Sequence, residues 1–227
     1  MQIPLRLSLH DDAIFDNFYA GAHVQTIATL KNFVNFNHDP VIFCYGENGV
    51  GKTHLLQAAC HAFSEKRISF FYFPLSAVPF SKNMFDSLEK QAVVCLDDVD
   101  VIARNVSQAE TLFHFYNRAR DHGVKLLMSA KKPPQQLSMT LRDLQSRFAS
   151  ALVLEIKKLS DAEKIKALQL RAQLRGFSLT DEVAHYLMHH HSRDTHDLFL
   201  ALEKLDQASL IEKRKLSIPF VKRVVKI

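Results

Sequence analysis

Cysteine, glycine and long apolar runs are scarce in the sequence, and each scarcity narrows the class of protein. No uninterrupted apolar stretch approaches the roughly 20 residues that a membrane-spanning helix requires. The N-terminus lacks a basic segment followed by an apolar stretch of the kind that directs secretion. The three cysteines, Cys44, Cys60 and Cys95, show no C-x-x-C spacing. We therefore expect a soluble, cytoplasmic protein without membrane contacts, whose cysteines are buried free thiols.

Length and charge indicate two parts of unequal character. The chain has 227 residues, 47% hydrophobic and 23% charged, which suits one large domain or two smaller ones. Residues 1–155 carry fifteen basic and fifteen acidic side chains, so the net charge of +5 lies in residues 156–227, with fourteen against nine. This shift suggests a domain boundary near residue 156. The basic part could face an acidic partner or nucleic acid, or be an ordinary solvated surface.

Three of only six glycines fall in one short run. The run fits the phosphate-binding pattern G-x-x-x-x-G-K-[ST] at every fixed position and consists of Gly46, Glu47, Asn48, Gly49, Val50, Gly51, Lys52 and Thr53. Apolar residues 41–45 precede it and a helical pattern follows it, so the loop lies where a buried strand turns into a helix. The alternative is a chance glycine-rich turn.

The chemistry of such a loop follows from its backbone. The glycines let N–H groups close around phosphates, and the N-terminus of the following helix adds a partial positive charge. Lys52 would reach the outer phosphates of ATP or ADP, and the Thr53 hydroxyl would ligate Mg²⁺. We count His54, the next residue, among the nucleotide contacts.

Two adjacent carboxylates, Asp97 and Asp98, end the apolar run that begins at residue 92. In open parallel sheets ligands bind beyond the carboxyl ends of the strands, so Asp97 can approach the Mg²⁺ ion and Asp98 can orient a water molecule. Ser129 also ends a strand and could sense the terminal phosphate. A polar strand end without a ligand is the alternative interpretation.

The order of the elements predicts the α/β class. Apolar runs at 41–45, 69–73, 92–97, 126–129 and 151–156 alternate with helical patterns, which favours a parallel five-stranded sheet covered on both faces. From residue 159 onward the pattern is helical only. Ser160 and Glu163 form a capping-box sequence that opens the first of these helices. We expect a C-terminal α-helical lid domain.

Residues 1–10 read as an extended chain, because their leucines alternate and Pro4 excludes a helix interior. Such a segment can fray or become an edge strand. It can also dock on another protein, with Gln2 hydrogen-bonding and Leu5 and Leu7 filling an apolar pocket.

Several motifs in order resemble one family. Residues 15–21, the phosphate loop, the Asp97-Asp98 pair and residues 144–148 are similar to the AAA+ module of the bacterial replication initiator DnaA. Residues 168–177 and 214–222 resemble the Hda family, the short DnaA homologues that inactivate the initiator. Residues 2–7 are similar to the sliding-clamp-binding peptide of that family, although Ile3 replaces a usual leucine. The resemblance implies a clamp-binding tail at 1–10, a nucleotide-binding AAA+ domain at 11–157 and a lid at 158–227.

The resemblance also implies a mechanism. A clamp-bound protein holding ADP would present Arg147 to the ATP site of DnaA and promote hydrolysis there, because an arginine finger stabilises charge on the transferred phosphoryl group. Phe18 would border the adenine. His196 lies where the family's lid has a sensor arginine, with Arg193 one turn earlier, and Lys131 replaces a usual acidic residue. These departures favour a weak or absent ATPase activity of the protein itself.

Alternatives from other classes stay open. A stand-alone ATPase or helicase loader would use the basic lid as a DNA contact, whereas a regulator would touch DNA only indirectly or weakly. A small P-loop kinase would need a phosphate-acceptor pocket, for which no signature is visible. From the residues alone, Arg142 and Arg147 could be solvated or serve a nucleotide on a neighbouring subunit, and a homodimer is possible.

Overall fold

The computed structural model describes residues 9–35 and 40–225, which form two compact units. One unit comprises Ala22–Lys157 together with the described residues before Asp16, and the other comprises Asp16–Gly21 and the residues from Lys158 onward. None of the helices in these ranges is long and apolar enough to cross a lipid bilayer.

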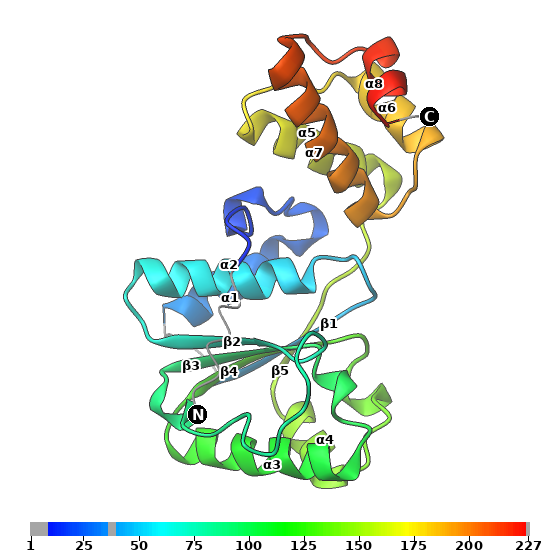
Figure 1. The fold of residues 1–227 in the computed structure, drawn as a ribbon. Coiled ribbons are helices and arrows are strands. Elements are labelled where there is room, and N and C mark those ends of the chain that lie inside the picture. Colours follow the sequence, from blue (N-terminus) through cyan, green and yellow to red (C-terminus); the bar gives the residue numbers. More distant parts are fainter. Residues whose placement is uncertain (1–8, 36–39, 226–227) are drawn as a thin grey trace. The chain divides into compact units, whose positions relative to one another are not determined.

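The first unit is built on the predicted five-stranded parallel sheet, which is confirmed (Figure 1). The strands are β1 (Val41–Tyr45), β2 (Phe70–Pro74), β3 (Val93–Asp97), β4 (Lys125–Ala130) and β5 (Leu152–Glu155). Their order is β2-β3-β4-β1-β5, so the strand before the phosphate loop has neighbours on both sides. Register pairs Cys44 with Ser129, and Pro74 with Asp97, which gathers the polar strand ends at one edge.

Helices cover both faces of this sheet (Figure 1). The helices α1 (Val24–Val34) and α2 (Lys52–Glu65) lie on one face, and α3 (Val106–Asp121) and α4 (Arg142–Ala149) lie on the other. Short 3-10 helices occur at Phe15–Asn17, Gly21–His23, Leu88–Lys90, Val99–Val101 and Pro134–Gln136. The core between the sheet and α3 is rich in aromatic rings, and Phe85 stacks on Phe115 with 4.9 Å between the ring centroids.

The second unit is helical, as the pattern after residue 159 predicted. Its helices are α5 (Asp161–Leu174), α6 (Asp181–His190), α7 (Thr195–Glu212) and α8 (Ile218–Val225). Ser160, Thr180 and Asp194 cap the first three through their side chains. The apolar faces meet in a core that includes Leu168, Leu187, Leu202, Leu205 and Phe220.

The segment Asp16–Gly21 groups with the helical unit, although the sequence had placed it within 11–157. Gly21 has a φ of +42°, and a Cβ atom there would lie 2.8 Å from Cε1 of Tyr19 and 2.9 Å from Oε1 of Glu163. A side chain would therefore collide with a residue of α5. This contact joins positions about 140 residues apart, and no local pattern in the sequence reports such a pairing.

Candidate functional site

The phosphate loop joins β1 to α2 through two glycines in the left-handed region. Gly49 has a φ of 77° and Gly51 a φ of 98°, and Gly51 is the N-cap of α2. L-residues adopt this conformation only with strain, so the turn requires glycine. The loop therefore delivers the chain directly into the N-terminus of a helix, where backbone N–H groups and the helix dipole favour an anion.

Gly46 is required for a different reason, because another segment of backbone passes beside it. A Cβ atom at this position would lie 2.3 Å from the carbonyl oxygen of Ile156. The N–H of Gly46 donates to Ala130 O at 3.2 Å, and the N–H of Ile156 donates to Tyr45 O at 2.7 Å. The start of the loop is thus held between the ends of β4 and β5.

Lys52 lies at the first position of α2 and turns back to the loop. Its Nζ donates to the carbonyl oxygens of Gly46 at 2.8 Å and Glu47 at 2.9 Å, and the residue is buried. Burial lowers the pKa of the Lys52 ammonium, and the carboxylates of Asp98, Asp97 and Asp100 oppose this effect. The ammonium is therefore preorganised at the loop within an acidic surrounding.

The other residues of the loop differ in exposure. Glu47, Asn48 and Gly49 are exposed, and Val50 is half-buried. His54 bonds through Nε2 to the carbonyl oxygen of Ile14 at 2.9 Å, and burial lowers the pKa of its imidazole. This bond fastens α2 to the chain segment that precedes Phe15.

Asp97 ends β3, and one hydroxyl group bonds each oxygen of its carboxylate. Its Oδ2 accepts from the Tyr72 hydroxyl at 2.9 Å, and its Oδ1 accepts from the Ser129 hydroxyl. The residue is 2% exposed, and both hydroxyl partners are also buried. Ser129 donates its single hydroxyl proton to Asp97, so its direct contact with a phosphate stays a prediction.

Asp98 follows in a left-handed conformation with a φ of 59°. Its N–H donates to Ser129 Oγ at 2.9 Å, and its Oδ2 accepts from Ser76 Oγ at 2.8 Å. This left-handed conformation ends the extended backbone of β3 at Asp97. Asp98 is half-buried, in contrast to Asp97.

The donor set fits a magnesium ion in its chemistry. Asp97 offers carboxylate oxygens, and Thr53, exposed in the first turn of α2, offers a hydroxyl oxygen. Mg²⁺ prefers oxygen ligands and commonly takes only one or two from the protein, the rest coming from water and phosphate. Thr53 and Asp97 are therefore the residues that would hold the ion.

Tyr72 and Gln57 were not among the residues expected at the site. Gln57 Nε2 donates to the Tyr72 hydroxyl at 3.3 Å, and its Oε1 accepts from the N–H of His10 at 3.0 Å. Burial raises the pKa of the Tyr72 phenol, and the nearby charge of Asp97 raises it further, so the phenol keeps its proton. The available signal in the sequence was a polar atom inside an otherwise apolar strand and an amide among buried aliphatic positions of α2.

Arg147 lies in the last turn of α4 and is half-buried. Its carbonyl oxygen accepts from the Tyr116 hydroxyl at 3.3 Å and from Ser150 Oγ at 2.8 Å. Among the residues that the structure describes, its guanidinium has no hydrogen bond or ion pair. Arg142, at the first position of the same helix, is exposed.

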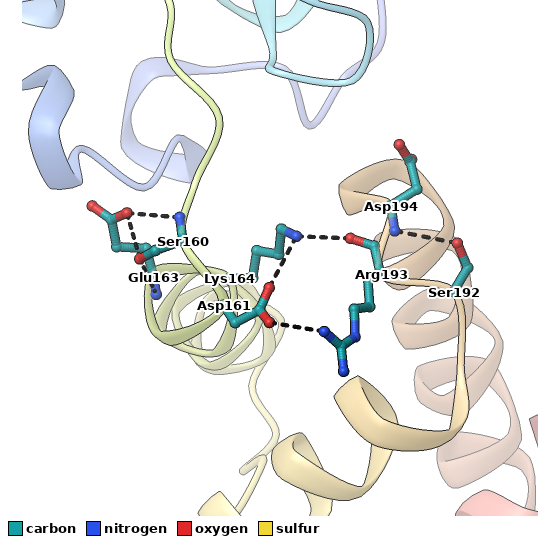
Figure 2. Close-up of polar contacts among 7 residues, drawn as sticks. All are labelled: Ser160, Asp161, Glu163, Lys164, Ser192, Arg193 and Asp194. Carbon is teal, nitrogen blue, oxygen red and sulfur yellow. Dashed lines mark hydrogen bonds and ion pairs between the residues drawn. The ribbon is translucent and has the colours of Figure 1, made fainter.

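Three expected nucleotide contacts belong to the helical unit. Figure 2 shows Arg193 between α6 and α7, where its guanidinium pairs with Asp161 at 3.5 Å and its carbonyl oxygen accepts from Lys164 Nζ at 2.9 Å. His196 lies in the first turn of α7, and its N–H donates to the Asp194 carboxylate at 2.9 Å. Phe18 lies in the segment Asp16–Gly21.

The residues expected to dock on a partner protein, Gln2, Leu5 and Leu7, lie outside the described residues. Their role stays a prediction.

Two stretches of the sequence match different families of known proteins. Residues 9–155 match the family of the bacterial DnaA ATPase domain, and residues 161–225 match the lid domain of Hda. Domain III of the replication initiation protein DnaA from Thermotoga maritima has a similar fold, with a TM-score of 0.79 at 20% identity over 96% of this chain and 98% of that chain.

Two further structures share the fold at lower scores. The AMPPCP-bound DnaA from Aquifex aeolicus reaches a TM-score of 0.70 at 22% identity, over 90% of this chain and 68% of that chain. A RuvB protein of Thermotoga maritima reaches 0.64 at 17% identity, over 89% and 66%. The first family match spans well over half of the sequence. The chain therefore belongs to the family of the bacterial DnaA ATPase domain, with an AAA+ fold followed by a helical lid.

Proposed function

We propose that the chain binds ADP or ATP at the phosphate loop. The glycine geometry at Gly49 and Gly51, the helix N-terminus and the Lys52 ammonium provide donors and positive charge for phosphates. The AMPPCP-bound DnaA structure, whose fold is similar, supports this assignment. When bound with the nucleotide, Mg²⁺ would neutralise phosphate charge; Thr53 and Asp97 would hold it, and Asp98 would orient a water molecule.

Within this family, we infer that the chain regulates replication initiation by acting on DnaA itself. The observation that carries the inference is the Arg147 guanidinium, which has no polar partner among the described residues although α4 holds its backbone firmly. An arginine whose backbone is held in place and whose guanidinium has no partner among the described residues suits an arginine finger, which stabilises charge on ATP bound to a neighbouring protein. The match of residues 161–225 to the Hda lid supports the same assignment.

In this role the protein activates ATP hydrolysis by DnaA and hydrolyses little ATP itself. Lys131 follows β4, and its N–H donates to the Asp100 carboxylate at 3.3 Å. The Lys131 charge is close enough to lower the pKa of Lys52, so a cation stands beside the loop where the family usually has an anion. We expect slow or absent hydrolysis of the protein's own nucleotide. Residues 1–10 would dock on the sliding clamp and bring Arg147 near DnaA on DNA.

The test is phosphate release from ATP-bound DnaA in the presence of DNA-loaded clamp. The wild-type protein should accelerate release, and Arg147→Ala should lower the acceleration about 10³-fold or more, because the finger charge is lost. Binding of a fluorescent ADP analogue should be unchanged, since Arg147 lies on α4, which covers the opposite face of the sheet from α2 (Figure 1).

Arg142→Ala is the matched control, because it removes the same charge from the exposed start of the same helix. It should retain most of the stimulation. Equal stimulation by wild-type protein and Arg147→Ala would refute the finger assignment. Rapid release by the protein without DnaA would instead favour a stand-alone ATPase.

A further inference from the structure

A chain of hydrogen bonds with only one possible direction leads to Asp97 from α2. The N–H of His10 can only donate, so the Gln57 atom that faces it must be the carbonyl oxygen. The Gln57 amide nitrogen then faces Tyr72 and can only donate to it. The Tyr72 oxygen accepts this bond, so its single proton is left for Asp97 Oδ2.

A second chain reaches the other oxygen of the same carboxylate. The N–H of Asp98 donates to Ser129 Oγ, which leaves the Ser129 proton for Asp97 Oδ1. Each carboxylate oxygen therefore accepts from a hydroxyl whose oxygen itself accepts a bond from an N–H group. Gln57, Tyr72, Asp97 and Ser129 are 4%, 8%, 2% and 0% exposed, so water competes little for these bonds.

We propose that Tyr72, itself held by Gln57, is a positioning residue that orients the Asp97 carboxylate for the Mg²⁺ ion of the bound nucleotide. The inference rests on the nucleotide binding proposed above and adds a role for two residues on β2 and α2. A carboxylate with two lone pairs on each oxygen can accept a hydroxyl and still ligate a metal. Because both oxygens are bonded to buried hydroxyl groups, rotation of the carboxylate is opposed.

Bonds of this kind usually contribute measurably to metal affinity. Removing an outer partner of a metal ligand typically lowers metal affinity about 10- to 100-fold. The partner acts on the ion and not on the phosphates, which the backbone of the loop and Lys52 would contact. Loss of the Tyr72 hydroxyl should therefore weaken the contribution of Mg²⁺ to nucleotide affinity and leave the affinity without Mg²⁺ unchanged.

The test is the affinity of the full chain for a fluorescent ADP analogue, measured in EDTA and across a magnesium titration. For Tyr72→Phe we expect the half-saturating Mg²⁺ concentration to rise about 10-fold, with the affinity in EDTA within about 2-fold of wild type. Gln57→Met should act in the same direction, because the Tyr72 hydroxyl loses the donor that directs its proton.

Tyr116→Phe is the matched control, since it removes a shielded tyrosine hydroxyl from the same unit, one that bonds a backbone carbonyl on α4. Its magnesium titration should match that of wild type. An unchanged titration for Tyr72→Phe would overturn the inference, and so would an equal loss of affinity with and without Mg²⁺, which indicates a structural role. Failure of the wild-type protein to bind the nucleotide would overturn the proposed function as well.

Discussion

Gly46 illustrates how a single hydrogen atom sets the geometry of the loop. The position has no left-handed backbone, yet a methyl group there would lie 2.3 Å from the Ile156 carbonyl oxygen. Neither the loop nor Ile156 can move freely, because the N–H groups of both are bonded to strand residues. Close packing thus requires glycine at the first position of the motif, whereas the left-handed backbone requires glycine at positions 49 and 51.

Gly46→Ala should destabilise the chain by about 1–3 kcal/mol through this overpacking. Gly123→Ala is the comparison, because Gly123 has a φ of +70° and open space around it, so only conformational strain of about 1–2 kcal/mol applies. Urea unfolding followed by circular dichroism measures both. Gly46→Ala should also weaken binding of the ADP analogue, and Gly123→Ala should not. Equal nucleotide affinity of the two variants would contradict the packing argument.

For single residues, the sequence predicted the motifs but not the hydrogen-bond partners of their side chains. The phosphate loop and the Asp97-Asp98 pair were recognisable because their spacing is local. The bonds of Asp97 to Tyr72 and Ser129 were not, because they join residues 25 and 32 positions apart through the register of three strands. The left-handed turn at Asp98 was also invisible, since no glycine marks it.

At the scale of elements, the start of α5 is stabilised by a reciprocal pair of bonds. Ser160 Oγ accepts from the N–H of Glu163 at 3.4 Å, and Glu163 Oε2 accepts from the N–H of Ser160 at 2.9 Å (Figure 2). Beside it, Lys164 and Asp161 hold the chain at Arg193. The helix start thus fixes the connection between α6 and α7, which carries the expected nucleotide contact.

Ser160→Ala should lower the free energy of unfolding by about 0.5–2 kcal/mol, because an N-cap bond at α5 is lost. Ser178→Ala serves as control, since this serine is exposed and no hydrogen bond of its side chain is seen in the described part of the chain. Thermal unfolding of the full chain measures both. Equal melting temperatures of the two variants would show that the cap contributes nothing.

The helices and strands could be predicted from the periodicity of the sequence, but the unit to which a short segment belongs could not. The capping box, the strand runs and the helical pattern after residue 159 are local patterns, and the structure has them where the sequence predicted. The grouping of the segment Asp16–Gly21 with the helical unit joins residues far apart in the sequence, and no local pattern indicates it.

At the scale of the whole molecule, the two units have apolar cores of their own. A core of the first unit surrounds β3, β4 and α3, and a core of the second joins α5 to α8, with no residue in common. Each unit therefore has its own source of stability.

We expect unfolding in urea to show two transitions, each sensitive to one core. Leu112→Ala should shift one transition and Leu202→Ala the other, each by about 2–5 kcal/mol, because both leucines are almost fully buried. Circular dichroism and calorimetry measure the shifts, and the ADP analogue should raise the transition that Leu112→Ala lowers. A single transition that both variants shift alike would contradict this expectation.

The three cysteines offer a practical consequence. All are buried free thiols, so maleimide reagents reach none of them in the folded protein, and burial raises the pKa of Cys44 to about 12. The sequence also contains no tryptophan. A cysteine introduced at exposed Ser146, one residue before Arg147, could therefore carry a dye as the sole label, and its fluorescence would report when a second protein arrives at that surface.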